Sequence, residues 1–151
     1  ESVELRIVGD GVERANLVRK VQNLGRDAQV IFTGQLSRDG VADEMRTSDV
    51  FVMASEFETF GVVYIEAMAS GNPVVTCKNG GSDNLIDKSN GILLNANSVD
   101  CFCVAMQEVR DNIDSYDRYE ISKGCISRYG SDAYYSRLYT LYRGLIGKGG
   151  T

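Results

Sequence analysis

The sequence contains no histidine and no tryptophan, and it has one proline among its 151 residues. Without histidine, the chain cannot form a Ser-His-Asp triad, a histidine general base or a zinc site of the Cys/His type. Carboxylates, backbone amides or a second polypeptide must therefore perform any chemistry. No apolar run approaches the roughly 18 residues that a membrane-spanning helix requires, and no signal peptide precedes the first predicted strand.

The sequence also lacks a basic stripe and a cysteine motif. Its 16 Lys and Arg residues against 21 Asp and Glu residues give a net charge of -5, so we predict no nucleic-acid partner. Four cysteines are present without a CxxC spacing: Cys77, Cys101, Cys103 and Cys125. A helical pattern turns Cys101 and Cys103 about 200° apart, so they cannot chelate a metal jointly. We expect reduced, mostly buried thiols in a cytoplasmic protein.

Short apolar runs alternate with helical patterns along most of the chain. The predicted strands are Glu4–Val8, Val30–Thr33, Asp49–Ala54, Pro73–Cys77 and Gly91–Leu94. The predicted helices are Val12–Leu24, Asp39–Thr47 and Gly61–Ser70, with further helices from about Ser98 to Ile146. This alternation predicts a Rossmann-like α/β fold, in which a parallel sheet of continuous apolar strands has helices on both faces. We assign residues 1–146 to one domain and residues 147–151 to a disordered tail.

A glycine turn follows the first predicted strand at Gly9-Asp10-Gly11. It resembles the start of a dinucleotide fingerprint, but Arg14 occupies the third glycine position and no acidic residue closes the next strand. We therefore interpret it as a tight turn from strand to helix.

The predicted helix from Gly61 is apolar nearly all round, and it contains one carboxylate, Glu66. We expect the helix to be largely buried, and a buried carboxylate needs a cation, hydrogen-bond donors or an opening to a cleft. Glu66 therefore either accepts hydrogen bonds from ligand hydroxyls, pairs with a distant arginine, or lies on a narrow polar stripe beside Tyr64. The residue types alone leave these alternatives open.

Glu58 lies just before this helix, in a loop at the carboxyl end of a strand, where ligands of α/β sheets bind. It could cap the helix, because an anionic group stabilises the unpaired amides there. The same amides, at Phe60, Gly61 and Val62, could instead hold an anion. Hydroxyl acceptors beside an anion site are typical of sites for a sugar phosphate or a nucleotide sugar. A glycosidase carboxylate pair is disfavoured, because eight helical residues span about 12 Å and that chemistry needs roughly 5–10 Å.

The segment Ser55–Gly71 resembles the paired-glutamate signature of the group-one retaining glycosyltransferases, whose GT-B fold has two facing Rossmann-like domains. Glu58 and Glu66 match the two acids of that signature. Further blocks match in the same order along residues 4–146, namely Val8–Gly11, Val30–Gly34, Ser48–Val52, Glu66–Val75, Gly80-Gly81 and Asn90-Gly91.

The resemblance implies a C-terminal domain that binds a nucleoside-diphosphate sugar. Glu66 would bind the ribose hydroxyls, and Glu58, the implied catalytic residue, would bind the transferred sugar near its reacting carbon. The backbone at Phe60–Val62 would hold the diphosphate or the sugar, and the loop Gly34–Leu36 would contact the base. Families of this fold usually need no metal, so we expect no metal and no cofactor.

The sequence departs from the family pattern at its start, because the strand and helix that carry an Arg and a Lys for the diphosphate are not present. That strand would lie between those predicted at Glu4–Val8 and Asp49–Ala54, so we expect a distorted sheet or a gap filled by another chain. The N-terminal acceptor domain is also not present. We therefore expect this chain alone to be inactive and regard the acceptor domain as its missing partner.

Two alternatives remain open at this point, a non-catalytic GT-B-like partner subunit and a nucleotide-sugar epimerase of the same architecture.

The C-terminal segment carries an aromatic stripe that includes Tyr135, Tyr139 and Tyr142 at helical spacing. We expect it to pack against the sheet or the missing domain, with peripheral membrane contact only through the parent enzyme.

Overall fold

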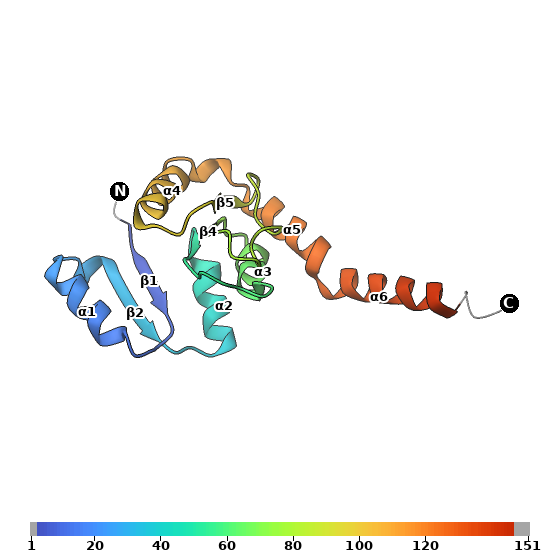
Figure 1. The fold of residues 1–151 in the computed structure, drawn as a ribbon, viewed down its shortest axis with the longest axis horizontal. Coiled ribbons are helices and arrows are strands. Elements are labelled where there is room, and N and C mark those ends of the chain that lie inside the picture. Colours follow the sequence, from blue (N-terminus) through green and yellow to red (C-terminus); the bar gives the residue numbers. More distant parts are fainter. Residues whose placement is uncertain (1–2, 147–151) are drawn as a thin grey trace. The chain divides into compact units, whose positions relative to one another are not determined.

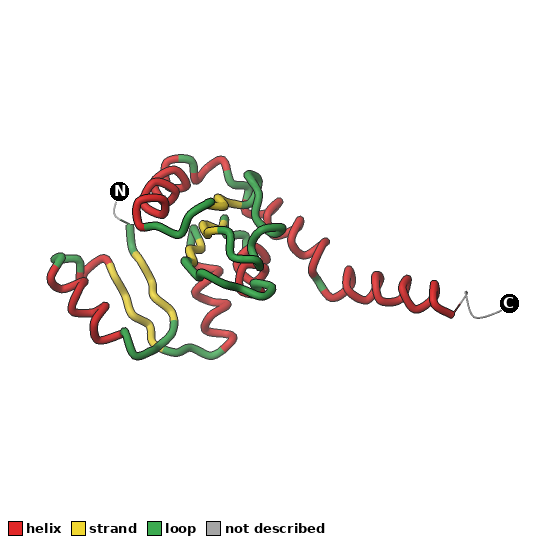
Figure 2. The backbone as a smooth tube through the Cα atoms, viewed as in Figure 1, coloured by secondary structure: helices red, strands yellow, loops and turns green. Residues whose placement is uncertain are grey.

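The computed structural model describes residues 3–146. These residues form two compact units that divide between Glu44 and Met45, and each unit is described by itself. Strands and helices alternate along both units, as Figure 2 shows. The expected tail at 147–151 lies outside the described residues, and the assignment of residues 1–146 to one donor-binding domain stays a prediction.

The first unit is a parallel strand pair with a crossover helix. Strand β1 (Leu5–Val8) leads to helix α1 (Arg14–Asn23), and strand β2 (Val30–Gly34) leads to helix α2 (Arg38–Thr47), which crosses into the second unit. The strands pair in parallel, and helix α1 supplies the crossover connection that a parallel pair needs. An ion pair ties β1 to α2, because Arg6 Nη2 lies 2.9 Å from Glu44 Oε1.

The second unit contains a three-stranded parallel sheet in the order β3-β4-β5. Its strands are β3 (Phe51–Met53), β4 (Val74–Cys77) and β5 (Gly91–Leu94). Strands β1 and β3 belong to different sheets, which agrees with the expectation of a sheet that is disturbed between them. The β4 strand is buried throughout because it has a neighbour on each edge.

Helices cover both faces of β4. On one face, Val75 and Cys77 pack against Phe102, Ala105 and Val109 of helix α4 (Val99–Asp111). Side chains alternate along a strand, so Thr76 faces the opposite side, where its hydroxyl lies 3.1 Å from the Tyr64 hydroxyl of helix α3 (Val62–Ala69). The alternation of apolar strands and helices in the sequence predicted a parallel sheet with helices on both faces, and the second unit has this arrangement.

Helix α5 (Arg118–Tyr129) packs against α3, and an arginine fixes their junction. Arg118 donates from Nη1 to the carbonyl oxygen of Ser48 at 2.8 Å and from Nη2 to Oδ1 of Asn72 at 2.9 Å. The buried Asn72 in turn donates from Nδ2 to the carbonyl oxygen of Met45 at 2.6 Å. These bonds join α5 to the loops at the ends of α2 and α3.

Helix α6 (Ser131–Ile146) contacts α5 and extends away from it (Figure 1). None of its described residues is buried, and its tyrosines are more than half exposed. The first alternative, that this aromatic stripe packs against the sheet, is therefore wrong for the second unit as described, whereas packing against the missing domain stays a prediction.

Two further sequence-based expectations need correction. The strands were expected to be buried, but Leu5 and Val8 of β1 are 42% and 41% exposed. The thiols were expected to be mostly buried, but only Cys77 and Cys125 are, whereas Cys101 is half-buried and Cys103 is exposed. The helix period explains this split, because Cys101 and Cys103 cannot both face the sheet from α4.

Candidate functional site

The first feature of the candidate site is the loop that joins β3 to α3. It carries Glu58, which is half-buried, between the exposed aromatic side chains of Phe57 and Phe60. The backbone of Glu58 forms a parallel β-bridge with Gly80, and its N–H donates to the carbonyl oxygen of Asn79 at 2.9 Å. Among the described residues, the Glu58 carboxylate has no hydrogen-bond or ion-pair partner, so its oxygens are free to accept from a ligand.

The second feature is the glycine pair after β4, which contacts the Glu58 loop directly. A Cβ at Gly81 would lie 2.9 Å from the Glu58 Cβ and 3.0 Å from the backbone nitrogen of Gly61. The carboxylate of Asp83 fixes the turn, because its Oδ1 accepts from the backbone N–H groups of Asn79 and Gly80. The glycine pair therefore allows the two loops to pack backbone against backbone.

The third feature is the N-terminus of α3. Gly61 adopts the left-handed conformation at φ 73°, which only glycine reaches without strain, and no side chain caps the helix. The alternative role of Glu58 as a helix cap is therefore wrong. The uncapped amides of the first turn remain donors for an anion, as the sequence suggested for Phe60, Gly61 and Val62.

Glu66 lies one helical turn further along α3 and is exposed. The expectation that the helix buries this carboxylate is wrong, because the helix buries Tyr64, Ala67 and Met68 and turns Glu66 away from them. The alternative that Glu66 is exposed is confirmed for Glu66 itself, although Tyr64 is completely buried and does not share an exposed stripe with it. Within the described residues Glu66 pairs with no arginine, and its binding of ligand hydroxyls stays a prediction.

The predicted base-contacting residues lie in the first unit. Gly34 ends β2 at φ +72°, and its carbonyl oxygen accepts from the N–H of Gly9 at 2.9 Å. Leu36 follows in the half-buried loop before α2 and packs close to Gly40, where a Cβ would lie 3.2 Å from its own. Their role in a joint site with Glu58 and Glu66 stays a prediction, because each unit is described by itself.

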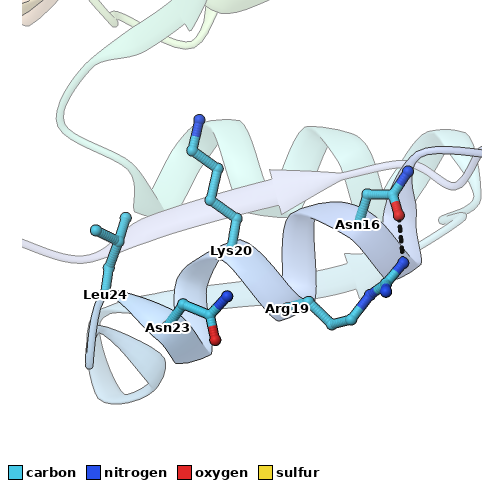
Figure 3. A pocket seen from close by; sticks show the side chains of 5 residues that line it. All are labelled: Asn16, Arg19, Lys20, Asn23 and Leu24. Atoms are coloured by element: carbon cyan, nitrogen blue, oxygen red, sulfur yellow. Dashed lines mark hydrogen bonds between the residues drawn. The ribbon is translucent and has the colours of Figure 1, made fainter.

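Two shallow depressions on the described surface are lined by residues other than the predicted ones. One lies on α6 beside Arg137 and Leu141. The other lies on α1, where Figure 3 shows Arg19 pointing to Asn16 while the Lys20 side chain extends separately. Neither depression includes a residue predicted to bind the nucleotide sugar.

The search for metal ligands and membrane spans covers the described residues only. No group of three or more His, Cys, Asp or Glu side chains is arranged there to hold a metal ion. No helix in residues 3–146 is long and apolar enough to cross a membrane. The expectation of a reaction without metal or cofactor stays a prediction.

The fold and these loops can be compared with known proteins. The family model "Glycosyl transferases group 1" matches residues 1–112. This chain belongs to that family. The match confirms the sequence-based assignment to the group-one glycosyltransferases and supports a sugar-transferring function.

Relatives of this glycosyltransferase chain are longer than the chain itself. The alpha-monoglucosyldiacylglycerol synthase of Streptococcus pneumoniae is 39% identical over 94 residues, which cover 62% of this chain and 21% of that protein. The chain is also similar in structure to sucrose-phosphate synthase from Thermosynechococcus elongatus, with a TM-score of 0.80 and 26% sequence identity. The match covers 97% of this chain and 39% of that one.

A third match is Anabaena HepE, solved in complex with UDP, with 24% identity and a TM-score of 0.79 over 93% of this chain and 41% of that chain. This likeness shows the fold alone. Together the solved structures confirm an α/β fold with parallel sheets that corresponds to part of a GT-B glycosyltransferase.

Sequence reasoning missed a buried polar cluster behind the Glu58 loop, formed by Tyr64, Thr76, Asn79 and Ser82. All four side chains are hydrogen-bonded. A buried tyrosine must bring its hydroxyl to a partner, but the sequence does not show that Tyr64 is buried, so no sequence signal indicated this cluster.

Proposed function

We propose that this chain is the nucleotide-sugar-binding domain of a retaining glycosyltransferase. The parent reaction transfers a sugar from a nucleoside diphosphate to a hydroxyl acceptor with retention of the anomeric configuration. The bond from the anomeric carbon to the diphosphate oxygen breaks, a bond to the acceptor oxygen forms on the same face, and the acceptor proton leaves with the diphosphate. The acceptor site is proposed to lie outside these residues, in a domain that contributes the other half of the enzyme.

One observation carries this proposal. Within the second unit, the partnerless Glu58 and Glu66 carboxylates lie before and after the uncapped N-terminus of α3. Carboxylates accept hydrogen bonds from hydroxyl groups, and helix amides bind anions without a metal. A nucleotide sugar has hydroxyl groups on its ribose and on its sugar, with a diphosphate between them.

The proposed roles are those that the resemblance to the group-one glycosyltransferases implies for each group. Glu66 binds the ribose hydroxyls, and Glu58 binds hydroxyls of the transferred sugar beside the reacting carbon. The backbone at Phe60–Val62 holds the diphosphate or sugar, and the loop at Gly34 and Leu36 contacts the base. The complex of HepE with UDP, a protein of the same fold, supports a nucleoside diphosphate as the ligand class.

A thermal-shift assay tests this proposal. It measures the melting temperature of the protein with UDP, GDP, ADP and the common nucleotide sugars of each. Ligand at 100 times its dissociation constant stabilises a folded protein by about 2.7 kcal/mol, which this assay detects. We expect one base to give a shift that Glu66→Ala abolishes, while Glu120→Ala on α5 retains it. A cooperatively folded wild-type protein that responds to none of these ligands would contradict the donor-binding role.

A further inference from the structure

The backbone of Glu58 itself is bonded to the segment that begins at Asn79. The Glu58 N–H donates to the Asn79 carbonyl oxygen at 2.9 Å, and the next residue of that segment forms the β-bridge. The Glu58 side chain itself has no partner among residues 3–146, and its neighbour Phe57 is 75% exposed. What fixes Asn79 therefore also fixes the backbone that carries the Glu58 carboxylate.

The Asn79 side chain uses its donors and its acceptor inside the protein. Its Oδ1 accepts from the Ser82 N–H at 3.1 Å, and its Nδ2 donates to the Tyr64 hydroxyl at 2.7 Å and to the Ser55 carbonyl oxygen at 3.2 Å. A backbone N–H can only donate, so the atom that faces Ser82 must be the amide oxygen. This bond sets the amide orientation and directs the Nδ2 group to Tyr64.

The Tyr64 hydroxyl continues this chain of bonds. It accepts from Asn79, and it also shares a hydrogen bond with the Thr76 hydroxyl, 3.1 Å away, in which either oxygen could be the donor. The Tyr64 ring is held as well, since it packs edge-on against Phe51 with centroids 6.3 Å apart. A Cβ at Gly61 would lie 2.3 Å from the same ring, so the ring fits closely against the start of α3. Fully satisfied buried networks of this kind hold one arrangement rigidly.

From this geometry we infer that Tyr64 and Asn79 are positioning residues for the Glu58 carboxylate, and hence for recognition of the sugar half of the donor. This inference rests on the proposed function. The network connects to the Glu58 loop but not to Glu66, whose place on α3 follows from the helix itself. Loss of the Tyr64 hydroxyl therefore weakens binding of the sugar and leaves binding of the ribose intact.

Tyr64→Phe tests the inference, because it keeps the ring and removes only the hydroxyl. Calorimetric titration of the protein with a nucleotide sugar, and separately with the same nucleoside diphosphate, measures both halves of the donor. We expect the dissociation constant of the nucleotide sugar to rise about fivefold, the effect of one ordinary hydrogen bond, with that of the diphosphate nearly unchanged. Thr76→Val is the matched control, since it removes a bond from the same network and leaves the Asn79 link in place.

A second measurement does not depend on ligand binding. Hydrogen exchange at the Glu58 amide is expected to accelerate in Tyr64→Phe, whereas exchange at the buried β4 amides stays as in the wild type. Asn79→Ser, which cuts the same link from its other end, should reproduce both effects if Tyr64→Phe unfolds.

Parallel loss of affinity for both ligands, or no loss for either, would overturn the positioning role. One result would refute this inference and leave the proposed function intact. In it, the wild-type protein binds the nucleotide sugar in a way that requires Glu66, but Tyr64→Phe changes the affinities for the nucleotide sugar and the diphosphate equally. Wild-type protein that binds neither ligand would refute the proposed function and this inference with it.

Discussion

Replacing Gly81 with alanine should push the turn at Gly80-Gly81 away from the Glu58 loop. The new Cβ would lie 2.9 Å from the Glu58 Cβ and 3.0 Å from the backbone at both Phe60 and Gly61. None of these atoms belongs to the flexible end of a side chain, so the two loops must separate. Forcing a methyl group into a packed contact costs about 1–3 kcal/mol.

Gly124→Ala is the matched control for this prediction. Gly124 lies within α5, and a Cβ there would meet no heavy atom within 4 Å. An alanine in a helix interior is favoured over glycine by about 0.5–1 kcal/mol. The same chemical change is therefore expected to stabilise the protein at one site and to destabilise it at the other.

Urea unfolding followed by tyrosine fluorescence measures both changes, since the protein has no tryptophan. We expect Gly81→Ala to lower the unfolding midpoint and the affinity for the nucleotide sugar, and Gly124→Ala to raise the midpoint and leave affinity unchanged. Gly81→Ala protein with wild-type stability and wild-type affinity would refute the argument that the two loops pack backbone against backbone.

Three further predictions concern packing, pH and thiol exposure. Arg118→Ala should lower the free energy of unfolding by about 1–3 kcal/mol in urea titrations, because the buried Asn72 amide loses a partner, whereas Arg110→Ala on α4 should change it little. The hydrogen bond from Arg6 lowers the pKa of Glu44 from its ordinary value, so this contact stabilises the fold above the ordinary pKa and is lost as pH falls through the lowered one. Glu44→Gln should therefore show a weaker loss of β1–β2 amide protection on acidification than the wild type. Iodoacetamide should modify the exposed Cys103 in the native protein, whereas the buried Cys77 and Cys125 should react only after unfolding. Burial also raises the pKa of the Cys125 thiol, which disfavours its reactive thiolate. Rapid alkylation of Cys125 in the native protein, detected by mass spectrometry, would contradict this account.

The fold could be predicted from the sequence because its strands and helices carry strong local signals. The helix predicted at Gly61–Ser70 is observed as Val62–Ala69, and Gly91–Leu94 is observed with the predicted bounds. The exposure of β1 could not be predicted, because it depends on which strands are neighbours rather than on the apolar residues of the strand itself. The exposure of α6 could not be predicted either, because it depends on which elements pack against the helix.

The site itself stays a prediction, but the local structure around its residues could be predicted in part. The sequence indicated the Glu58 loop and the start of α3, but it gave no information on the burial of Glu66 or Tyr64. Both residues lie in one apolar helix, and only the direction of packing decides which of them faces the interior. The contact between Asn79 and Glu58 joins segments 21 residues apart through backbone atoms, so no periodicity could reveal it.

A crystal structure of the protein with a nucleoside-diphosphate sugar tests the central claim most directly. The account predicts ribose hydroxyls within hydrogen-bond distance of the Glu66 carboxylate, sugar hydroxyls at Glu58, and the diphosphate or sugar against the backbone at Phe60–Val62. A nucleotide sugar bound with both carboxylates exposed to solvent and free of contacts would contradict it.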